Sequence, residues 1–238
     1  MGELHISVAA EEIAHIGSFA ITNSLLTTYV TMAILFLLAF SVKMAPVKNG
    51  ILRAPALLEI LVGGFYNFLS PILGKRTDRL FPLLMTFFLF IMIGNWVGLL
   101  PGVGPITLHH VPLFRAPSAD LSTTLALALV SVTVTQYMSI EALGVGTYLS
   151  KFFNFKNPIN TFVGLLELIS EFAKLLSFSF RLFGNIFAGE VLLVVITFLV
   201  PPLLPIPFLG LEFFVGFIQA LVFTMLTTIF IVVATEHH

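Results

Sequence analysis

Cysteine is absent from this chain of 238 residues, and charged residues make up only 10% of it. Without thiols the chain has no disulfide framework, no cysteine metal site and no thiolate chemistry. A formal net charge of -1 excludes the basic surface that nucleic-acid binding requires, so no nucleic-acid partner is expected. Hydrophobic residues make up 58% of the chain, which is too large a share for a soluble domain. The composition therefore indicates an integral membrane protein.

Motifs of enzymatic chemistry are also missing. The sequence contains no phosphate-binding glycine loop, no zinc-ligand spacing and no arrangement of nucleophile and base. We therefore expect no cofactor, no metal site and no catalysis by this polypeptide alone. Residues 1–18 carry Glu3, Glu11 and Glu12 where a secretory signal would carry positive charge, so we interpret them as an external segment of the mature chain.

Long apolar runs, separated by prolines, glycines and charges, predict a single all-α integral membrane domain over residues 1–238. A helix of about 20 apolar residues crosses the hydrocarbon of a bilayer, whereas a shorter mixed stretch suits an interfacial helix. The expected segments are a first span at 19–42, an interfacial helix at 55–73, a second span at 81–100, a third at 121–145, a long helix at 159–200 and a last helix at 208–235. A short basic turn is expected after the third span.

The long helix is predicted because residues 159–200 contain no proline. Its length of roughly 60 Å is about twice the thickness of the hydrocarbon, so the helix must be strongly tilted or protrude. Four prolines between residues 201 and 207 then force a turn. The last two helices are therefore expected to form a long, tilted antiparallel pair within about five membrane-crossing helices plus one interfacial helix.

Basic residues are distributed unevenly among the connections between the five predicted crossings. The odd-numbered connections hold Lys43, Lys48, Arg53, Lys75, Arg76, Arg79, Lys151 and Lys156. The even-numbered connections hold only Arg115. Because positive charge favours the cytoplasmic side, we expect the N-terminus outside and the C-terminus in the cytoplasm.

Polar residues recur at helical spacing along one side of the long helix. They are Glu167, Ser170, Lys174, Ser177, Arg181 and Asn185. A polar stripe on an apolar helix must face water or protein, because lipid satisfies neither charge nor hydrogen bond. For Lys174 a structural ion pair with Glu167 or Glu171 is an alternative explanation.

Arg181 lies in the middle of the long apolar segment. A cation at the bilayer centre costs about 2.5 kcal/mol or more, which indicates a functional group facing protein or water. No carboxylate lies three or four residues away, so its partner must come from elsewhere. Glu190, nine residues further on, is on another side of the helix and roughly 13 Å nearer the outer surface. The two residues are therefore expected to serve different compartments.

The last helix adds Glu212 and Gln219, which are seven residues apart and share a face. In an antiparallel pair, Gln219 comes to the level of Arg181, and Glu212 comes near Glu190. Two carboxyl groups that face each other could take up and release protons near neutrality. Alternatively, Glu212 could cap the last helix at the interface.

Two further polar residues have simple structural explanations. Asp120 directly precedes the third span and is predicted to be its N-cap. Asn95, inside the second span, is predicted to form an interhelical hydrogen bond.

The run Arg181-Leu182-Phe183-Gly184-Asn185, followed by Ala188-Gly189-Glu190, resembles the signature of subunit a of F-type ATP synthases. The similarity extends to Asn95 with Leu99-Leu100-Pro101, Pro117-Ser118-Ala119-Asp120, Glu167, Lys174 and Gln219-Ala220. The N-terminal third matches mainly in hydropathy. Some members of that family have histidine where Glu212 stands and an acidic residue where Gly98 stands, so a polar role for residues 95–101 is in doubt.

The resemblance implies a non-catalytic, ion-conducting subunit in the lipid bilayer, beside a rotating ring of c-type proteolipids. It also implies b-type peripheral-stalk subunits and, indirectly, the soluble ATPase head as partners. Arg181 would displace the ion from each ring carboxylate and block leakage between two offset half-channels. Asn185 and Gln219 would line the ring contact, while Glu190 and Glu212 would line the outer half-channel. Weaker candidates are Glu167, Lys174, Asp120 and Ser177.

The implied function is to couple a transmembrane ion gradient to ATP synthesis. The expected ion is the proton, with Na⁺ left open because its ligands would lie largely in the ring. A self-contained secondary transporter that uses Arg181 and Glu190 is the alternative, but we find no internal repeat of the kind common in transporters. The expected location is a bacterial plasma membrane rather than a thylakoid, because no transit peptide is apparent.

Overall fold

The computed structural model describes residues 7, 9–16, 19–44, 47–48, 51–52, 56–100, 107–108, 111–152, 158–199 and 205–235. Helices form most of this part of the chain: α1 (Asn23–Met44), α2 (Ala56–Leu73), α3 (Thr77–Gly98), α4 (Leu121–Leu143), α5 (Val145–Phe152), α6 (Pro158–Leu199) and α7 (Pro205–Thr235). Three antiparallel strand pairs accompany them: β1 (Glu12–Ile16) with β2 (Phe19–Thr22), β3 (Val47–Lys48) with β4 (Ile51–Leu52), and β5 (Thr107–Leu108) with β6 (Val111–Pro112). Single 3₁₀ turns lie at Gly74–Arg76 and Pro117–Ala119.

Five helical stretches of the described residues are long and apolar enough to cross a membrane. Four of them are α1, α4, α6 and α7, and the fifth runs through α2 and α3 from Leu58 to Gly98. The predicted all-α membrane fold, with about five crossing helices and one further helix, is therefore confirmed. Of the basic residues counted above, Arg53 and Lys156 lie outside the described residues.

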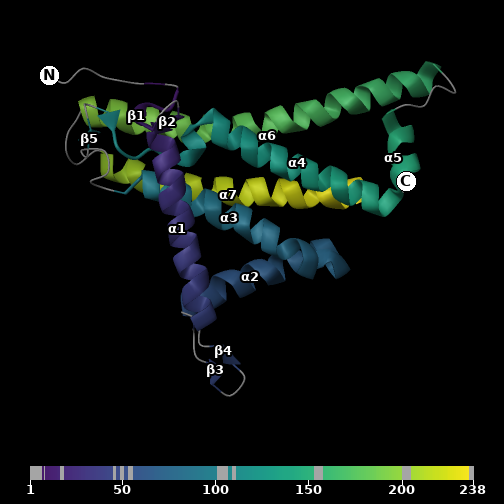
Figure 1. Cartoon of the computed structure of the whole chain (residues 1–238), viewed down its shortest axis with the longest axis horizontal. Helices are drawn as coiled ribbons and strands as arrows, with labels where there is room; N and C mark the ends of the chain where they lie inside the picture. Colours follow the sequence, from purple (N-terminus) through teal and green to yellow (C-terminus); the bar gives the residue numbers. More distant parts are fainter. Residues whose placement is uncertain are drawn as a thin grey trace.

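Helices α3, α4, α6 and α7 run alongside one another, and α1 crosses them steeply (Figure 1). The core lies where α3 and α7 meet, with Phe87 and Phe178 both packed edge-on against Phe223. Two ends of the bundle can be distinguished. The Glu190 end gathers β1, β2, the start of α4, the end of α6 and the start of α7, and the Glu141 end gathers the starts of α3 and α6 with the end of α7 (Figure 1).

Several buried hydroxyl groups of α7 form hydrogen bonds within their own helix. Thr224, Thr227 and Thr228 each donate to the backbone carbonyl four residues earlier, which satisfies the hydroxyl within its own helix. Ser131 and Thr227 also join the two helices by a hydrogen bond of 2.8 Å. Small hydroxyl residues of this kind allow close packing of membrane helices.

The long helix α6 and the last helix α7 form an antiparallel pair (Figure 1). α6 is 42 residues long and α7 is 31 residues long. Both exceed the roughly 20 residues that a perpendicular span requires, so each must be inclined in a bilayer or extend beyond it. Pro158 opens α6, where its missing N–H is not needed and its fixed φ suits the first helical position.

The start of the first span differs from the prediction of 19–42. Residues 19–22 are strand β2, which pairs with β1, and the helix begins only at Asn23. The Asn23 amide oxygen accepts from the backbone N–H of Glu11 at 3.2 Å and of Ser24 at 2.9 Å. The N-cap of α1 is Thr22, whose hydroxyl accepts from the backbone N–H of Leu25 at 3.2 Å, so the helix starts directly after it.

Helix α5 was not predicted, since only a basic turn was expected after a third span at 121–145. α4 ends at Leu143 because Gly144 adopts a φ of +79°, which glycine tolerates without strain. α5 then packs tightly on α6, and a Cβ added at Gly164 would overlap the carbonyl oxygen of Phe152. The second span likewise starts earlier than the predicted 81, since α3 begins at Thr77.

Candidate ion-translocation site

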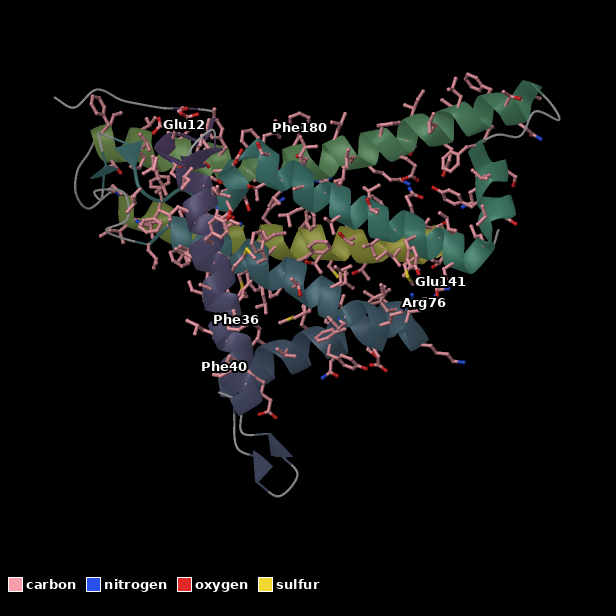
Figure 2. The ribbon with its side chains drawn as sticks, in the orientation of Figure 1. Glu12, Phe36, Phe40, Arg76, Glu141 and Phe180 are labelled. Atoms are coloured by element: carbon pink, nitrogen blue, oxygen red, sulfur yellow. The ribbon has the colours of Figure 1, made fainter. Side chains whose placement is uncertain are left out.

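Arg181 lies near the middle of α6 on an exposed face of the helix. The same face exposes Ser170, Ala173, Ser177, Asn185 and Ala188. We refer to Arg181 together with these five residues as the Arg181 face. Phe180 lies on the side of α6 that points away from α4 and α7 (Figure 2). Within the described part of the chain, no carboxylate forms a salt bridge with Arg181.

A hollow of about 260 Å³ extends from Arg181 toward the Glu141 end. Its walls include Lys174 and Ser177 from α6 and Phe230 from α7. The Lys174 ammonium lies 5.4 Å from the centre of the Phe230 ring, a distance at which cation–π attraction operates. The two cations therefore lie along one recess between α6 and α7, whose walls are otherwise mostly apolar.

Lys174 forms its ion pair with Glu171, at 2.7 Å. Glu167, the other predicted partner, is half-buried and forms no salt bridge among the described residues. The second carboxylate oxygen of Glu171 accepts a hydrogen bond of 2.6 Å from the Gln136 side-chain amide. The amide oxygen of Gln136 in turn accepts a hydrogen bond from the Tyr148 hydroxyl. Burial and the nearby Glu171 carboxylate raise the pKa of Tyr148. Lys174 thus belongs to a polar chain that joins α4, α5 and α6.

Antiparallel pairing was predicted to bring Gln219 to the level of Arg181, and in the structure Gln219 contacts Asn185, one turn from Arg181. The Asn185 side-chain amide donates to the Gln219 carbonyl oxygen at 2.8 Å. Gln219 is buried, whereas Asn185 is exposed on the Arg181 face. This hydrogen bond fixes the register of α6 against α7 one turn from Arg181.

Glu212 lies well inside α7 and is only 5% exposed, so the alternative that it caps the helix at the interface is wrong. Its carboxyl group packs against Gly189 of α6, where an added Cβ would overlap the carboxyl oxygens. Glycine is therefore required at 189 for Glu212 to occupy this position. The structure brings Glu212 next to the residue that precedes Glu190.

Glu190 binds Arg115 rather than facing Glu212. The Arg115 Nε donates to a Glu190 carboxylate oxygen at 3.1 Å, and the guanidinium lies 5.7 Å from the centre of the Phe187 ring. The Arg115 side chain is 5% exposed and that of Glu190 is 35% exposed. Arg115 was not predicted as a site residue, although it was the one basic residue in the even-numbered connections.

Asp120 and Asn95 have contrasting outcomes. Asp120 is confirmed as the N-cap of α4, since its side chain accepts from the Ser122 N–H at 3.0 Å. The prediction that Asn95 forms an interhelical hydrogen bond is wrong. Asn95 is fully buried where Gly216 packs close to its Cβ, and neither amide atom has a hydrogen-bond partner among the described residues.

The site therefore has three parts along the α6–α7 pair. Carboxyl groups of Glu190 and Glu212 lie at one end, Arg181 is exposed in the middle, and the recess that contains Lys174 follows toward the other end. Carboxyl groups can carry protons, and a fixed cation favours the ionised form of a carboxylate brought near it. The arrangement suits ion transfer to and from a partner better than covalent chemistry.

Comparison with known proteins gives a consistent family assignment. A family model described as ATP synthase A chain matches residues 24–232. ATP synthase subunit a of Moorella thermoacetica is 35% identical over 92% of this chain and 94% of that protein. The subunit a of Desulfotalea psychrophila is 35% identical over 88% and 83%, and that of Syntrophobacter fumaroxidans is 32% identical over 98% and 92%. The chain therefore belongs to the ATP synthase A chain family.

Proposed function

We propose that this chain is the ion-translocating membrane subunit of a rotary ATP synthase, in which Arg181 acts on carboxylates of a rotating ring of c-type proteolipids. The observation that carries the proposal is the exposed position of Arg181 on α6, without a carboxylate partner among the described residues. A cation in a membrane-spanning helix requires a counter-charge or water. The small residues of the Arg181 face would allow a helix of the ring to approach closely.

In this mechanism two offset half-channels lead to the ring. Glu190 and Glu212 line the path from the outer side, and Asn185 and Gln219 lie at the ring contact. The recess beside Lys174 and Ser177 belongs to the inner side, with Glu167 nearby. A ring carboxylate that arrives beside Arg181 loses its proton, because the cation stabilises the ionised form. Arg181 also separates the two half-channels, since a second cation cannot pass a fixed one at low energy. Asp120 has a structural role as a helix cap.

The geometry favours this function over a self-contained transporter. A transporter binds its solute between its own helices, near the bilayer midplane. Arg181 instead lies on an exposed face of α6, so its partner is expected outside the chain. The b-type stalk subunits and the soluble ATPase head complete the proposed assembly.

The ring contact can be tested because the chain contains no cysteine. We expect Ala188→Cys, on the Arg181 face, to cross-link to a small proteolipid when a maleimide–benzophenone reagent is attached in the purified complex. Phe36→Cys on α1, whose native side chain is 70% exposed, is the matched control and should give no such product. Equal cross-linking from both positions, or none from Ala188→Cys, would argue against the proposed ring contact.

The proposed orientation places the N-terminus outside a bacterial plasma membrane and the C-terminus in the cytoplasm. Its support is the excess of basic residues in the odd-numbered connections. An impermeant maleimide added to intact cells should label Ala9→Cys but not Lys151→Cys, both at exposed positions. After permeabilisation both should react. Labelling of Lys151→Cys from outside the intact cell would reverse the orientation.

A further inference from the structure

The side chain of Arg115 joins three separate parts of the chain at the Glu190 end. Its Nε donates to Glu190 on α6, and its two terminal nitrogens donate to the backbone carbonyls of Ala9 at 2.8 Å and Ser7 at 3.0 Å. A guanidinium presents its donors in a fixed planar fork, so one arginine can hold several acceptors in a set geometry. Arg115 thus fixes the N-terminal segment and the Glu190 carboxylate relative to each other.

Arg115 is itself held in position by its backbone and its neighbours. Its backbone N–H donates to the Thr27 hydroxyl on α1 at 3.1 Å, and Thr27 is fully buried. The Asn23 amide donates to the Pro112 carbonyl at 3.3 Å, which ties the same loop to the first turn of α1. Since the guanidinium is only 5% exposed, its position is set by the fold rather than by chance contact at the surface.

The N-terminal segment approaches Glu190 with a charge of its own. Glu11 lies near enough to Glu190 to interact with it electrostatically. The backbone of Glu11 is attached to the start of α1, because its carbonyl accepts from the Asn23 N–H at 3.0 Å. The two like charges repel each other, and the pairing of Arg115 with Glu190 offsets the charge of that carboxylate.

We propose that Arg115 is the positioning residue of Glu190, and that through it the described N-terminal residues, 7 and 9–16, form part of the outer entrance of the ion path. The inference rests on the proposed function, in which Glu190 lines the outer half-channel. Arg115 holds the carboxylate in one orientation toward the path, and the N-terminal segment covers the other side of the guanidinium. Ions from outside therefore reach Glu190 along a path bordered by this segment.

A double-mutant cycle in the reconstituted complex tests the positioning role. We expect Arg115→Gln and Glu190→Gln each to lower gradient-driven ATP synthesis, by about 10-fold for loss of a charge-assisted hydrogen bond. The double variant should be no slower than Glu190→Gln alone, because Arg115 acts through Glu190. Arg115→Lys should recover part of the rate, since it keeps the charge but not the planar fork. If the reductions in rate of the two single variants multiply in the double variant, the proposal is wrong.

Hydrogen exchange tests the role of the N-terminal segment without relying on activity. Amides of residues 9–16 should exchange about 10-fold faster in Arg115→Gln and Arg115→Lys, because both lose the hydrogen bonds to the Ser7 and Ala9 carbonyls. Arg79→Gln, which removes an arginine from an exposed pair with Glu141, is the control. In this variant the amides of residues 9–16 should exchange at the unaltered rate. Unchanged exchange in the Arg115 variants would mean that Arg115 does not hold this segment at the entrance.

The two proposals can fail separately. If Arg115→Gln does not assemble, Arg115→Lys in the presence and absence of Glu190→Gln carries the same comparison. Normal ATP synthesis by Arg181→Ala would overturn the proposed function itself. Loss of synthesis in that variant, together with independent effects of Arg115 and Glu190, would overturn only the positioning role.

Discussion

At the scale of single residues, the acidic groups of the site differ in their surroundings. Glu190 is partly exposed and paired with Arg115, whereas Glu212 is buried against the backbone of α6. A group that exchanges ions with water needs access, and a group further inside needs a neighbour that passes ions on. The positions of the two residues fit successive steps of one outer path.

Removing both carboxyl groups tests that path. Glu190→Gln combined with Glu212→Gln should slow proton conduction through the membrane sector by about 10-fold or more, because an amide cannot carry the proton. The rate is measured by quenching of a pH-sensitive dye in reconstituted vesicles. Glu59→Gln, an exposed position on α2, is the control. An unchanged rate in the double variant would remove both residues from the path.

At the scale of the helices, the contact between α6 and α7 depends on a few close approaches. Asn185 with Gln219 sets the register, and Gly189 provides the space that the Glu212 carboxyl group occupies one turn further along. Because the two helices are antiparallel, a change at either contact shifts every residue pair along the interface. The site is therefore sensitive to side-chain volume as well as to charge.

Gly189→Ala should displace the Glu212 carboxyl group from its place against α6. The added methyl group overlaps the carboxyl oxygens, which lie at the end of a flexible side chain and can turn away at little cost to the packing of the helices. We expect slower proton conduction with little change in the thermal stability of the complex. Gly210→Ala on α7 is the matched control, since an added Cβ there contacts nothing within 4 Å. Equal effects from both substitutions would mean that the contact with Glu212 is not limiting.

The helices themselves were largely predictable, because apolar runs and prolines set their limits. The absence of proline over residues 159–200 anticipated α6, which runs from Pro158 to Leu199. Helix α5 was missed because its eight residues are too few to give a hydrophobic run of membrane length. Strand β2 was missed because Phe19–Thr22 is as apolar as the helix that follows, and its pairing with β1 is a tertiary contact.

The side-chain partners were less predictable than the helices. Helical spacing placed Gln219 near Arg181, and it does contact Asn185 one turn away. The choice between Glu167 and Glu171 as partner of Lys174 could not be made from spacing alone, since three and seven residues both return to one face. Arg115 lies 75 residues from Glu190 in the chain, so nothing in the sequence pattern links the two.

At the scale of the whole molecule, charged groups are separated between the two ends of the bundle. Arg76 and Glu141 lie together at one end (Figure 2), and Arg79 pairs with Glu141 there at 2.5 Å. Arg115 and Glu190 form their pair near the end of α6, at the opposite end of the bundle. Between them Arg181 is an exposed cation on a helix that crosses most of this distance. The account therefore depends on that arginine having its counter-charge in another subunit.

The most direct test of this claim is gradient-driven ATP synthesis by the reconstituted complex carrying Arg181→Ala. We predict that synthesis falls to the level of vesicles without complex, because ring carboxylates are no longer discharged and the half-channels are no longer separated. Arg79→Ala, which removes an exposed arginine outside the proposed site, should leave synthesis close to normal. Normal synthesis by Arg181→Ala would contradict the account.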